Sequence, residues 1–496
     1  MSGARQVLDA VLDTGSFLDW GPQVQPWHPD TPSYAAELAS ARTRAGTEEA
    51  VVVGEGRLDG RPVAVIVGEY AFLAGSIGLH AARLITHCIT QATARGLPLL
   101  AAPASSGTRM QEGTPAFVQM ATVAAALAAH RRCGLAYLVW LRNPTLGGVF
   151  ASWGSLGQIT AAQPRALIGF LGPRVYEALH DAPFPPGVQT AENLRAHGLL
   201  DAVLPLSAVR GSAVRALDVL CGPSRCSTAT PVAAVFTDEP GALADETAPV
   251  WESVQRTRRR DRPGVREILA LGAVDIVELS GTGRGGTGPQ VVLALARIGD
   301  APCVLVGQDR HAQGDGAELG VAALRVSRRG MAVAEELRLP LITLVDTAGA
   351  ELSAAAEEQG IAQQIASCLY DAASLTVPTL AVLLGQGSGG AALALANADR
   401  VIAARHAWLS PLPPEGASAI LHRTAERAAE LAQRQGIGSL ALRAERIVDV
   451  VVDERPDAAD EPGAFADRLL RAMRAELDAL NAMGTAQRLA RRTRPR

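Results

Sequence analysis

Two of the chain's pairs of consecutive glycines each follow an apolar run and open a run of small residues. The pairs are Gly147-Gly148 and Gly389-Gly390, and the subtractions 389 − 147 and 390 − 148 both give 242. Consecutive glycines at a helix start can aim adjacent backbone N–H groups at one oxygen atom. Such donors stabilise a developing enolate or other oxyanion, and loss of one can cost about 3 kcal/mol of transition-state stabilisation. Because the pair is repeated, we interpret all four glycines as candidate catalytic donors.

A second small-residue turn repeats at the same separation. Gly107-Thr108-Arg109 lies between an apolar run and a helix-like stretch, and Gly349-Ala350 takes the same place 242 residues later, since 349 − 107 is 242. The apolar run before each turn also repeats, as Leu97-Pro98-Leu99 and Leu339-Pro340-Leu341. Small residues at such a turn let backbone N–H groups approach a ligand. The sequence therefore predicts substrate-binding residues in both turns.

Side-chain nucleophile machinery is not evident in the sequence. No G-x-S-x-G elbow is present and the nine histidines are scattered, with His311 after a strand-like run as the one considered for a site. Glu112 and Glu358 are the loop carboxylates that a hydratase or isomerase would need. The pattern favours backbone-donor chemistry on an activated carbonyl over covalent catalysis.

Composition excludes several function classes. All 46 basic residues are Arg, so no lysine exists to form a Schiff base, to serve a P-loop or to carry biotin. The net charge of −4 and the absence of a clustered basic face predict no nucleic-acid partner. Of the six cysteines only Cys221 and Cys226 are close, and a lone C-x4-C pair predicts no metal site. We expect a cytoplasmic chain, because neither a signal peptide nor a membrane-length apolar run is evident.

The elements that must position these turns alternate between strand-like and helix-like runs. Val63–Val67 and Leu97–Ala101 have the pattern of strands, whereas Gly78–Ala94 and Glu357–Ala372 have helical spacing of apolar residues. This alternation predicts an α/β fold. The expected organisation is a helical lead-in over 1–50, a first domain over 51–211, a linker over 212–261, a second domain over 262–484 and a basic, solvated tail over 485–496.

Seven segments together form a recognisable set. They are Phe72–Gly78, which contains Gly75 and Ser76, Gly107–Gly113, Asn143–Ala151, Ala166–Val175, Asp346–Ala350, Gly387–Ala391 and Pro413–Leu421. On these segments the first half resembles the β subunit, and the second half the α subunit, of the bacterial acetyl-CoA carboxylase carboxyltransferase. The resemblance implies two tandem crotonase-like domains of the ClpP/crotonase ββα superhelix type.

The resemblance also implies how the two glycine pairs divide the reaction. Gly147 and Gly148 would hold the thioester oxygen of an acyl-CoA, with Gly75, Ser76 and the Gly107 turn as substrate-binding residues. Gly389 and Gly390 would hold the ureido oxygen of biotin, which arrives as carboxybiotin on a partner and is not attached to this chain. The implied partners are a biotin carboxylase, a biotin carboxyl carrier protein and further copies of this chain in a homodimer or larger assembly.

The chain departs from the family pattern in several places. Residues 1–50 lack the four-cysteine zinc module, Ala82-Arg83-Leu84 replaces Gly-Glu-Lys, and Gly307-Gln308-Asp309-Arg310 replaces His-Gln-Lys-Gly. The leading prediction is a carboxyltransferase that makes malonyl-CoA from acetyl-CoA for fatty acid biosynthesis. Two alternatives are a malonate or malonyl-thioester decarboxylase component and a catalytically weak scaffold that binds a biotin carrier.

Overall fold

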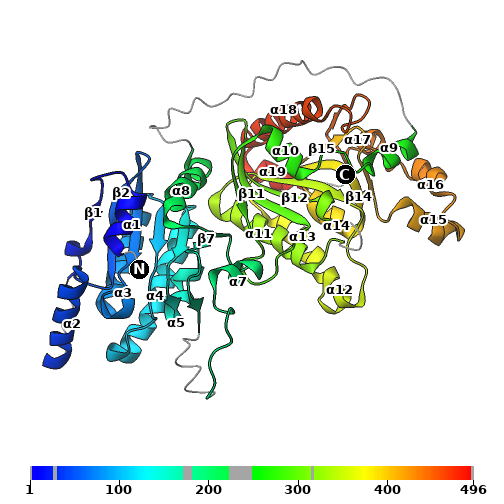
Figure 1. Ribbon diagram of the computed structural model, residues 1–496. Coiled ribbons are helices and arrows are strands. Elements are labelled where there is room, and N and C mark those ends of the chain that lie inside the picture. The colour runs from blue at the N-terminus through cyan, green and yellow to red at the C-terminus, as the bar shows by residue number, and fades with distance from the viewer. Residues whose placement is uncertain are drawn as a thin grey trace. The chain divides into compact units, whose positions relative to one another are not determined.

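The computed structural model describes residues 3–25, 29, 31–170, 181–222, 249–313 and 318–492. The chain divides into two compact units, Met1–Thr228 with Gly283–Gly285, and Ala229–Thr282 with Gly286–Arg496. Figure 1 shows the strands and helices of both units. Several predicted features lie outside the described residues: the end of the Ala166–Val175 motif from residue 171, Cys226, the part of the linker from 223 to 248 and the last four residues of the tail.

The first unit is built on a seven-stranded sheet that is antiparallel at one side and parallel over the rest. Its strand order is β1 (Leu18–Asp19), β2 (Val51–Leu58), β3 (Arg61–Gly68), β4 (Leu99–Ala102), β5 (Tyr137–Leu141), β7 (Ile159–Ala162) and β9 (Ala202–Val203). Strands β1 to β3 pair antiparallel, and β3 to β9 pair parallel. Asp59 and Gly60 join β2 to β3 with φ values of 51° and 73°, the left-handed pair that a two-residue hairpin turn needs.

Helices cover both faces of this sheet. In Figure 1, α1 (Ala4–Val11) and α8 (Leu206–Cys221) lie on one face, and α3 (Leu79–Ala94) and α4 (Gly113–Arg132) lie on the other. The remaining elements are α2 (Pro32–Ala45), α5 (Gly147–Phe150), α7 (Ala191–Ala196), the short pair β6 (Thr145–Leu146) and β8 (Ile168–Gly169), and the 3-10 turns η1 (Gly21–Gln23), η2 (Leu73–Gly75), η3 (Met110–Glu112) and η4 (Trp153–Ser155).

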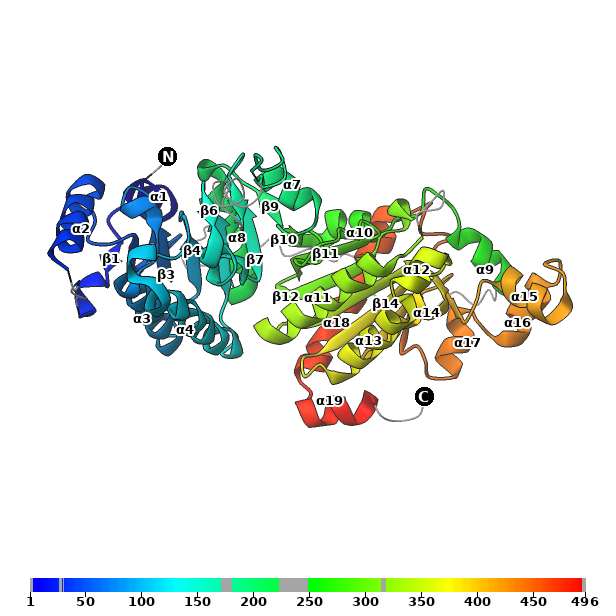
Figure 2. The same ribbon diagram turned by 90° about the horizontal axis from the view of Figure 1, so that it is seen from below.

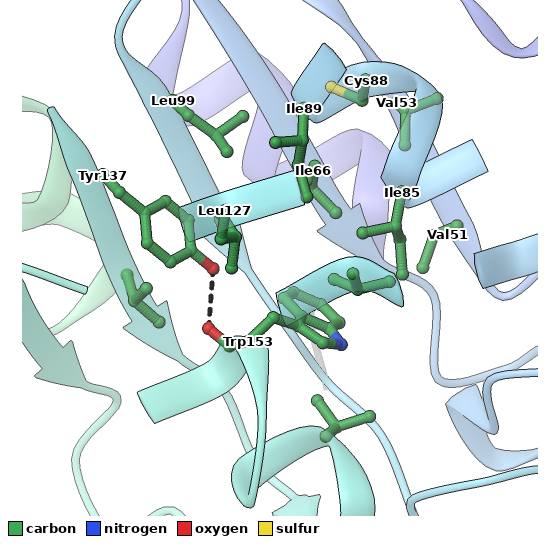
Figure 3. Close-up of a cluster of buried hydrophobic side chains, with 14 of the residues drawn as sticks. Val51, Val53, Ile66, Ile85, Cys88, Ile89, Leu99, Leu127, Tyr137 and Trp153 are labelled. Carbon is green, nitrogen blue, oxygen red and sulfur yellow. Dashed lines mark hydrogen bonds between the residues drawn. The ribbon is translucent and has the colours of Figure 1, made fainter. Parts of the chain in front are cut away.

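The core of this unit holds the turn after β5 in place. Figure 3 shows Tyr137 and Trp153 among buried aliphatic side chains from β2, β3, α3 and α4. The Tyr137 hydroxyl donates to the Trp153 carbonyl at 2.7 Å, which satisfies the phenol inside the apolar cluster. Since Tyr137 lies on β5 and Trp153 in η4, this bond fixes both ends of the segment that contains Gly147 and Gly148.

The second unit repeats the sheet topology of the first. Its strand order is β10 (Ala273–Leu279), β11 (Val291–Ile298), β12 (Ala301–Gln308), β13 (Leu341–Thr347), β14 (Thr379–Ser388), β15 (Arg400–Ala404) and β17 (Val450–Val452). A short strand, β16 (Trp408–Ser410), pairs with the last three residues of β14, after the part of β14 that pairs with β15. Strands β10 to β12 pair antiparallel and β12 to β17 pair parallel. Both sheets therefore change from antiparallel to parallel at their third strand.

Helices again cover both faces. Figures 1 and 2 show α10 (Val265–Gly272) and α18 (Pro462–Asn481) on one face, and α11 (Val321–Leu337) and α13 (Ile361–Ser374) on the other. The other elements are α9 (Val250–Thr257), η5 (Arg310–Ala312), α12 (Ala354–Glu358), α14 (Gly389–Ala396), α15 (Pro414–His422), α16 (Ala428–Gln435), α17 (Ser439–Ala444) and α19 (Thr485–Arg492). The predicted α/β class is confirmed.

Several predicted boundaries differ from the structure. The linker was expected to begin at residue 212, but α8 continues to Cys221, and α9 also lies inside the predicted linker. The lead-in over 1–50 is not wholly helical, because Leu18 and Asp19 pair with β2. The helix expected over Glu357–Ala372 is split into α12 and α13 by Gly360, whose φ is +80°.

The tail was expected to be solvated and is partly packed. Residues Thr485–Arg492 form α19, and the Arg488 guanidinium is 6% exposed and donates to the Thr376 carbonyl at 2.8 Å.

Candidate active site

Two glycine turns meet in the first unit, at the carboxyl ends of β4 and β5. Gly107 and Gly147 have φ values of +115° and +58°, which favour glycine. A Cβ atom placed on Gly107 would lie 3.5 Å from the Gly147 Cα and 3.6 Å from the Gly148 nitrogen. The two turns therefore face each other closely, with about the width of one methyl group between their backbones. We call Gly107, Thr108, Gly147 and Gly148 the first donor site.

A serine hydroxyl closes the first of these turns. Ser105 Oγ accepts from the Gly107 N–H at 3.0 Å, and the Ser105 carbonyl accepts from the Leu146 N–H at 2.9 Å. The N–H groups of Gly147 and Gly148 lie in the first turn of α5, where no intrahelical acceptor exists. A Cβ on Gly148 would meet Thr108 Oγ1 at 2.9 Å, so the threonine side chain borders the second glycine. This arrangement leaves backbone donors beside a polar side chain.

The second unit has the matching glycine turns at the ends of β13 and β14. Gly349 and Gly389 have φ values of +144° and +68°. Thr347 Oγ1 accepts from the Gly349 N–H at 3.2 Å, as Ser105 does for Gly107. Gly389 and Gly390 are the first two residues of α14. We call Gly349, Ala350, Gly389 and Gly390 the second donor site.

The two sites match in more residues than the glycines. Ser105 and Thr347 are 242 residues apart, and so are Ile77 and Leu319, which bridge Thr108 and Ala350 respectively. Ile77 and Leu319 each lie two residues before a helix, α3 and α11 respectively, so the two turns are supported in the same way. The structure brings together the predicted residues of each site, and the equivalence extends to their supports.

Arg109, predicted to bind substrate, is enclosed by protein groups. Its guanidinium is 1% exposed and donates to Glu49 at 2.5 and 3.1 Å, to Glu112 at 3.2 Å, and to both the carbonyl and the hydroxyl of Ser76. These contacts use all five of its N–H donors. Burial alone would lower the pKa of Arg109, but the hydrogen bonds and charge of Glu49 outweigh burial and raise it. In this structure Arg109 anchors the turn.

The predicted residues Gly75 and Ser76 lie beneath the same turn. Gly75 has a φ of +65°, and a Cβ on it would lie 2.1 Å from the Ala104 carbonyl oxygen, so no side chain fits. The Ser76 carbonyl accepts from Arg109 at 2.7 Å. Gly75 thus packs against the backbone of Ala104, and Ser76 binds Arg109 of the Gly107 turn.

Glu112 is a structural carboxylate rather than a free base. It accepts from Arg109, from the Tyr34 hydroxyl at 2.6 Å and from the Leu79 N–H at 2.5 Å. Burial, followed by the hydrogen bond to Glu112, raises the pKa of Tyr34. Glu358, the other carboxylate considered, is exposed at the end of α12. His311 lies 3.5 Å from Glu267 and is also partly exposed.

A buried polar network supports the second donor site. Gln308 accepts from the Asp346 N–H at 3.0 Å and donates to the Ala391 carbonyl at 2.8 Å, which joins β13 to α14. Asp346 pairs with Arg310 at 3.1 Å and accepts from the Gln386 N–H at 2.9 Å. Burial raises the pKa of Asp346 although Arg310 opposes the shift. The segment that departs from the family's His-Gln-Lys-Gly thus holds the turn through Gln308 and Arg310.

The sequence reasoning missed the residues that support the donors. Ser105 and Thr347 share the offset of the glycines, so the repeat itself carried their signal. Glu49 had no such signal, because its partner Arg109 is 60 residues away in the chain. No group of three or more His, Cys, Asp or Glu side chains that could hold a metal ion occurs in the described part of the chain.

A family comparison decides which enzymes this arrangement belongs with. The model of the carboxyl transferase domain matches residues 3–489. The chain belongs to the carboxyl transferase family. It is 55% identical over 487 residues to a probable biotin-dependent acyl-coenzyme A carboxylase beta3 subunit of Mycobacterium tuberculosis, a match that covers 98% of this chain and 96% of the relative. The resemblance stated from the sequence motifs is confirmed, and the protein is a carboxyltransferase.

Further comparisons agree with this assignment. The chain is 37% identical to the acetyl-coenzyme A carboxylase carboxyl transferase subunits beta/alpha of Saccharopolyspora erythraea, over 97% of this chain and 85% of the relative. Transcarboxylase 12S, whose structure is described as a hexamer with methylmalonyl-coenzyme A bound, matches with a TM-score of 0.76 at 20% identity, covering 100% of this chain and 91% of that one. This likeness confirms the predicted tandem crotonase-like fold. No helix among the described residues is long and apolar enough to cross a membrane.

Proposed function

We propose that the two donor sites hold the two substrates of one carboxyl transfer. The first donor site, with Gly147 and Gly148, would hold the thioester oxygen of an acyl-CoA. The second, with Gly389 and Gly390, would hold the ureido oxygen of carboxybiotin on a partner carrier. The observation that carries the proposal is the duplicated turn pair, in which a hydroxyl-closed glycine turn lies beside the first turn of a helix in each unit.

The chemistry of the donors fits both ligands. A thioester oxygen gains negative charge when the α-carbon of the acyl-CoA gives up its proton, and a ureido oxygen gains it when the neighbouring nitrogen gives up its carboxyl group. The α-proton would pass to the biotin ring that the carboxyl group has left. Backbone N–H groups stabilise both negative charges. Biotin supplies the transferable carboxyl group when it is bound. Glu112, the carboxylate of the Gly107–Gly113 segment, is held by Arg109 and Tyr34 and is not free to act as a base. The role that we assign to the glycine turns is donor stabilisation.

The partners follow from the composition and the relatives. Without lysine the chain cannot carry biotin, so a biotin carboxylase and a biotin carboxyl carrier protein would supply the carboxylated cofactor. The solved relative is described as a hexamer, which supports a homo-oligomer for this chain as well. The cytoplasmic location expected from the sequence stays a prediction.

The acyl group is the finer part of the proposal. We take acetyl-CoA, giving malonyl-CoA for fatty acid biosynthesis, as the leading substrate, because one relative is named for acetyl-coenzyme A. A malonyl-thioester decarboxylase component is the main competing function, and a scaffold for a biotin carrier is the other. These three differ in whether carboxyl loss occurs and whether it needs biotin.

The test is a reverse transfer assay with purified protein, malonyl-CoA or methylmalonyl-CoA, and biocytin as the acceptor. CoA products are followed by mass spectrometry. Carboxyl loss that depends on biocytin supports the proposal and ranks the acyl groups. Loss that is independent of biocytin indicates the decarboxylase. A folded protein that removes no carboxyl group from either CoA ester would contradict the proposal and indicate the scaffold.

A further inference from the structure

Two buried hydroxyls at the second donor site have no hydrogen-bond partner among the described residues. They belong to Ser388, the residue before Gly389, and to Ser410, which is in register with Ser388 between the parallel strands β14 and β16. Their exposures are 1% and 4%. A buried hydroxyl without a partner costs free energy, so its presence calls for an explanation.

Ser388 occupies a position where serine normally caps a helix. It is the N-cap residue of α14, with extended dihedral angles of φ −111° and ψ 130°, yet its hydroxyl makes no capping bond. A serine at this position usually accepts from the second or third N–H of the helix. Here the hydroxyl makes no such bond and is left for another group.

The hydroxyl lies close to the second glycine turn. Apart from the chain neighbours of each glycine, a Cβ atom on Gly349 would meet Ser388 Oγ at 3.8 Å, and one on Gly389 would meet the Pro411 carbonyl oxygen at 3.5 Å. The Ser388 hydroxyl therefore lies next to the Gly349 turn and directly precedes Gly389 in the chain.

The first donor site has no hydroxyl at the matching position. Leu146 precedes Gly147 as Ser388 precedes Gly389, again with extended dihedral angles, φ −126° and ψ 166°. Leu146 is in register with Gly169, as Ser388 is with Ser410. The turn therefore forms without a hydroxyl, and the serine pair is a difference between two otherwise equivalent sites.

This difference matches the chemistry of the two proposed ligands. A thioester carbonyl is flanked by sulfur and carbon, which form weak hydrogen bonds at most. A ureido carbonyl is flanked by two nitrogens, and the nitrogen that does not carry the carboxyl group keeps its hydrogen. Backbone N–H groups can only donate, whereas a hydroxyl can accept that N–H.

We propose that the Ser388 hydroxyl is a ligand-binding group for the ureido ring, accepting its N–H while Gly389 and Gly390 donate to its carbonyl oxygen. Ser410, which is in register with Ser388, places a second hydroxyl near the start of α14. The inference rests on the proposed function and adds to it a side-chain group beside the backbone donors.

The experiment is a ligand-observed NMR titration of the full chain with biocytin, and separately with acetyl-CoA. Ser388→Ala is expected to raise the Kd for biocytin about tenfold, the effect of one hydrogen bond worth about 1.4 kcal/mol. Its Kd for acetyl-CoA should stay within about twofold. Ser388→Thr, which keeps the hydroxyl, should restore most of the biocytin affinity. Ser374→Ala, at an exposed serine on α13, is the control and should change neither Kd.

Several outcomes separate the inference from its alternatives. Unchanged biocytin affinity in Ser388→Ala would overturn it and leave the hydroxyl to a buried water. An equal loss of both ligands would indicate a structural role and also overturn it. If Ser388→Ala does not fold, Ser388→Cys keeps the unbranched shape of the side chain but replaces the hydroxyl by a weak acceptor, and it should weaken biocytin binding similarly. The reverse transfer assay on the unmodified chain tests the proposed function separately, so a positive assay with an unaffected Ser388→Ala variant would refute the inference alone.

Discussion

The buried pair between Glu49 and Arg109 offers a sharp test of how the first donor site is supported, because the neighbouring residue provides a control. Glu49 is 4% exposed and binds Arg109 at 2.5 and 3.1 Å, whereas the Glu48 side chain is 90% exposed and lies 3.3 Å from Arg42. Glu48→Gln and Glu49→Gln make the same chemical change to adjacent residues. Only the second removes a buried charge that faces a buried guanidinium.

The expected magnitude follows from these contacts. A charge-assisted hydrogen bond is worth roughly 1 kcal/mol more than a neutral one, and Glu49 makes two such bonds to Arg109. Glu112 still faces the guanidinium in Glu49→Gln, so the full cost of an uncompensated buried charge is not reached. We expect Glu49→Gln to destabilise the first unit by about 2–3 kcal/mol, and Glu48→Gln by less than about 0.5 kcal/mol.

Differential scanning fluorimetry measures the difference. For a unit of this size, about 2–3 kcal/mol corresponds to a fall in Tm of about 5–10 °C. Because Arg109 anchors the Gly107 turn, Glu49→Gln should also raise the KM for acyl-CoA several-fold while the KM for biocytin stays near its wild-type value. Equal Tm values for the two glutamine variants would refute the argument that this pair holds the turn.

Three further predictions concern the donors, the acid stability and the cysteines. Gly147→Ala and Gly389→Ala each place a side chain at a left-handed residue, at a cost of about 1–2 kcal/mol, and each should lower kcat at least about a hundredfold. Gly147→Ala should lose affinity for acyl-CoA, and Gly389→Ala should lose affinity for biocytin. An equal effect of either variant on both ligands would contradict the division of the two donor sites. Burial would raise the pKa of Glu454, but its hydrogen bonds and charge interaction with Arg262 outweigh burial and lower that pKa below the ordinary 4.5. The stability that the ionised Glu454 contributes above pH 4.5 should therefore be lost as the pH falls below that value. In urea denaturation from pH 3 to 7, the free energy of unfolding should change less steeply with pH in Glu454→Gln than in the wild type, and an equal pH dependence would contradict this role of Glu454. Burial raises the pKa of Cys303 to about 12, whereas Cys133 is exposed, so iodoacetamide at pH 8 should label Cys133 and leave Cys303 unlabelled in peptide mass spectra unless the protein is unfolded.

The glycine turns could be predicted from the sequence because they are repeated and local. Gly107 and Gly349, like Gly147 and Gly389, keep a fixed separation, and the φ values show why: each turn needs a left-handed residue where only glycine is unstrained. The same repeat contains Ser105 and Thr347, whose hydroxyls each accept from the N–H of the glycine two residues later in the chain.

Contacts between distant residues could not be predicted in this way. The role of Arg109 depends on Glu49, 60 residues earlier, and nothing in the local pattern distinguishes an arginine that binds substrate from one that pairs with a buried carboxylate. The break at Gly360 was missed because apolar spacing continues across it, although its φ of +80° ends the helical path. The unpartnered hydroxyl of Ser388 is visible only when its surroundings are known.

The reverse transfer assay tests the central claim most directly. With malonyl-CoA and biocytin, the account predicts that acetyl-CoA forms only when biocytin is present, and that Gly148→Val and Gly390→Val each abolish this reaction, because the added side chains meet Thr108 in the first case and Ile365 in the second. Formation of acetyl-CoA at the same rate without biocytin, or transfer that survives both valine substitutions, would contradict the account.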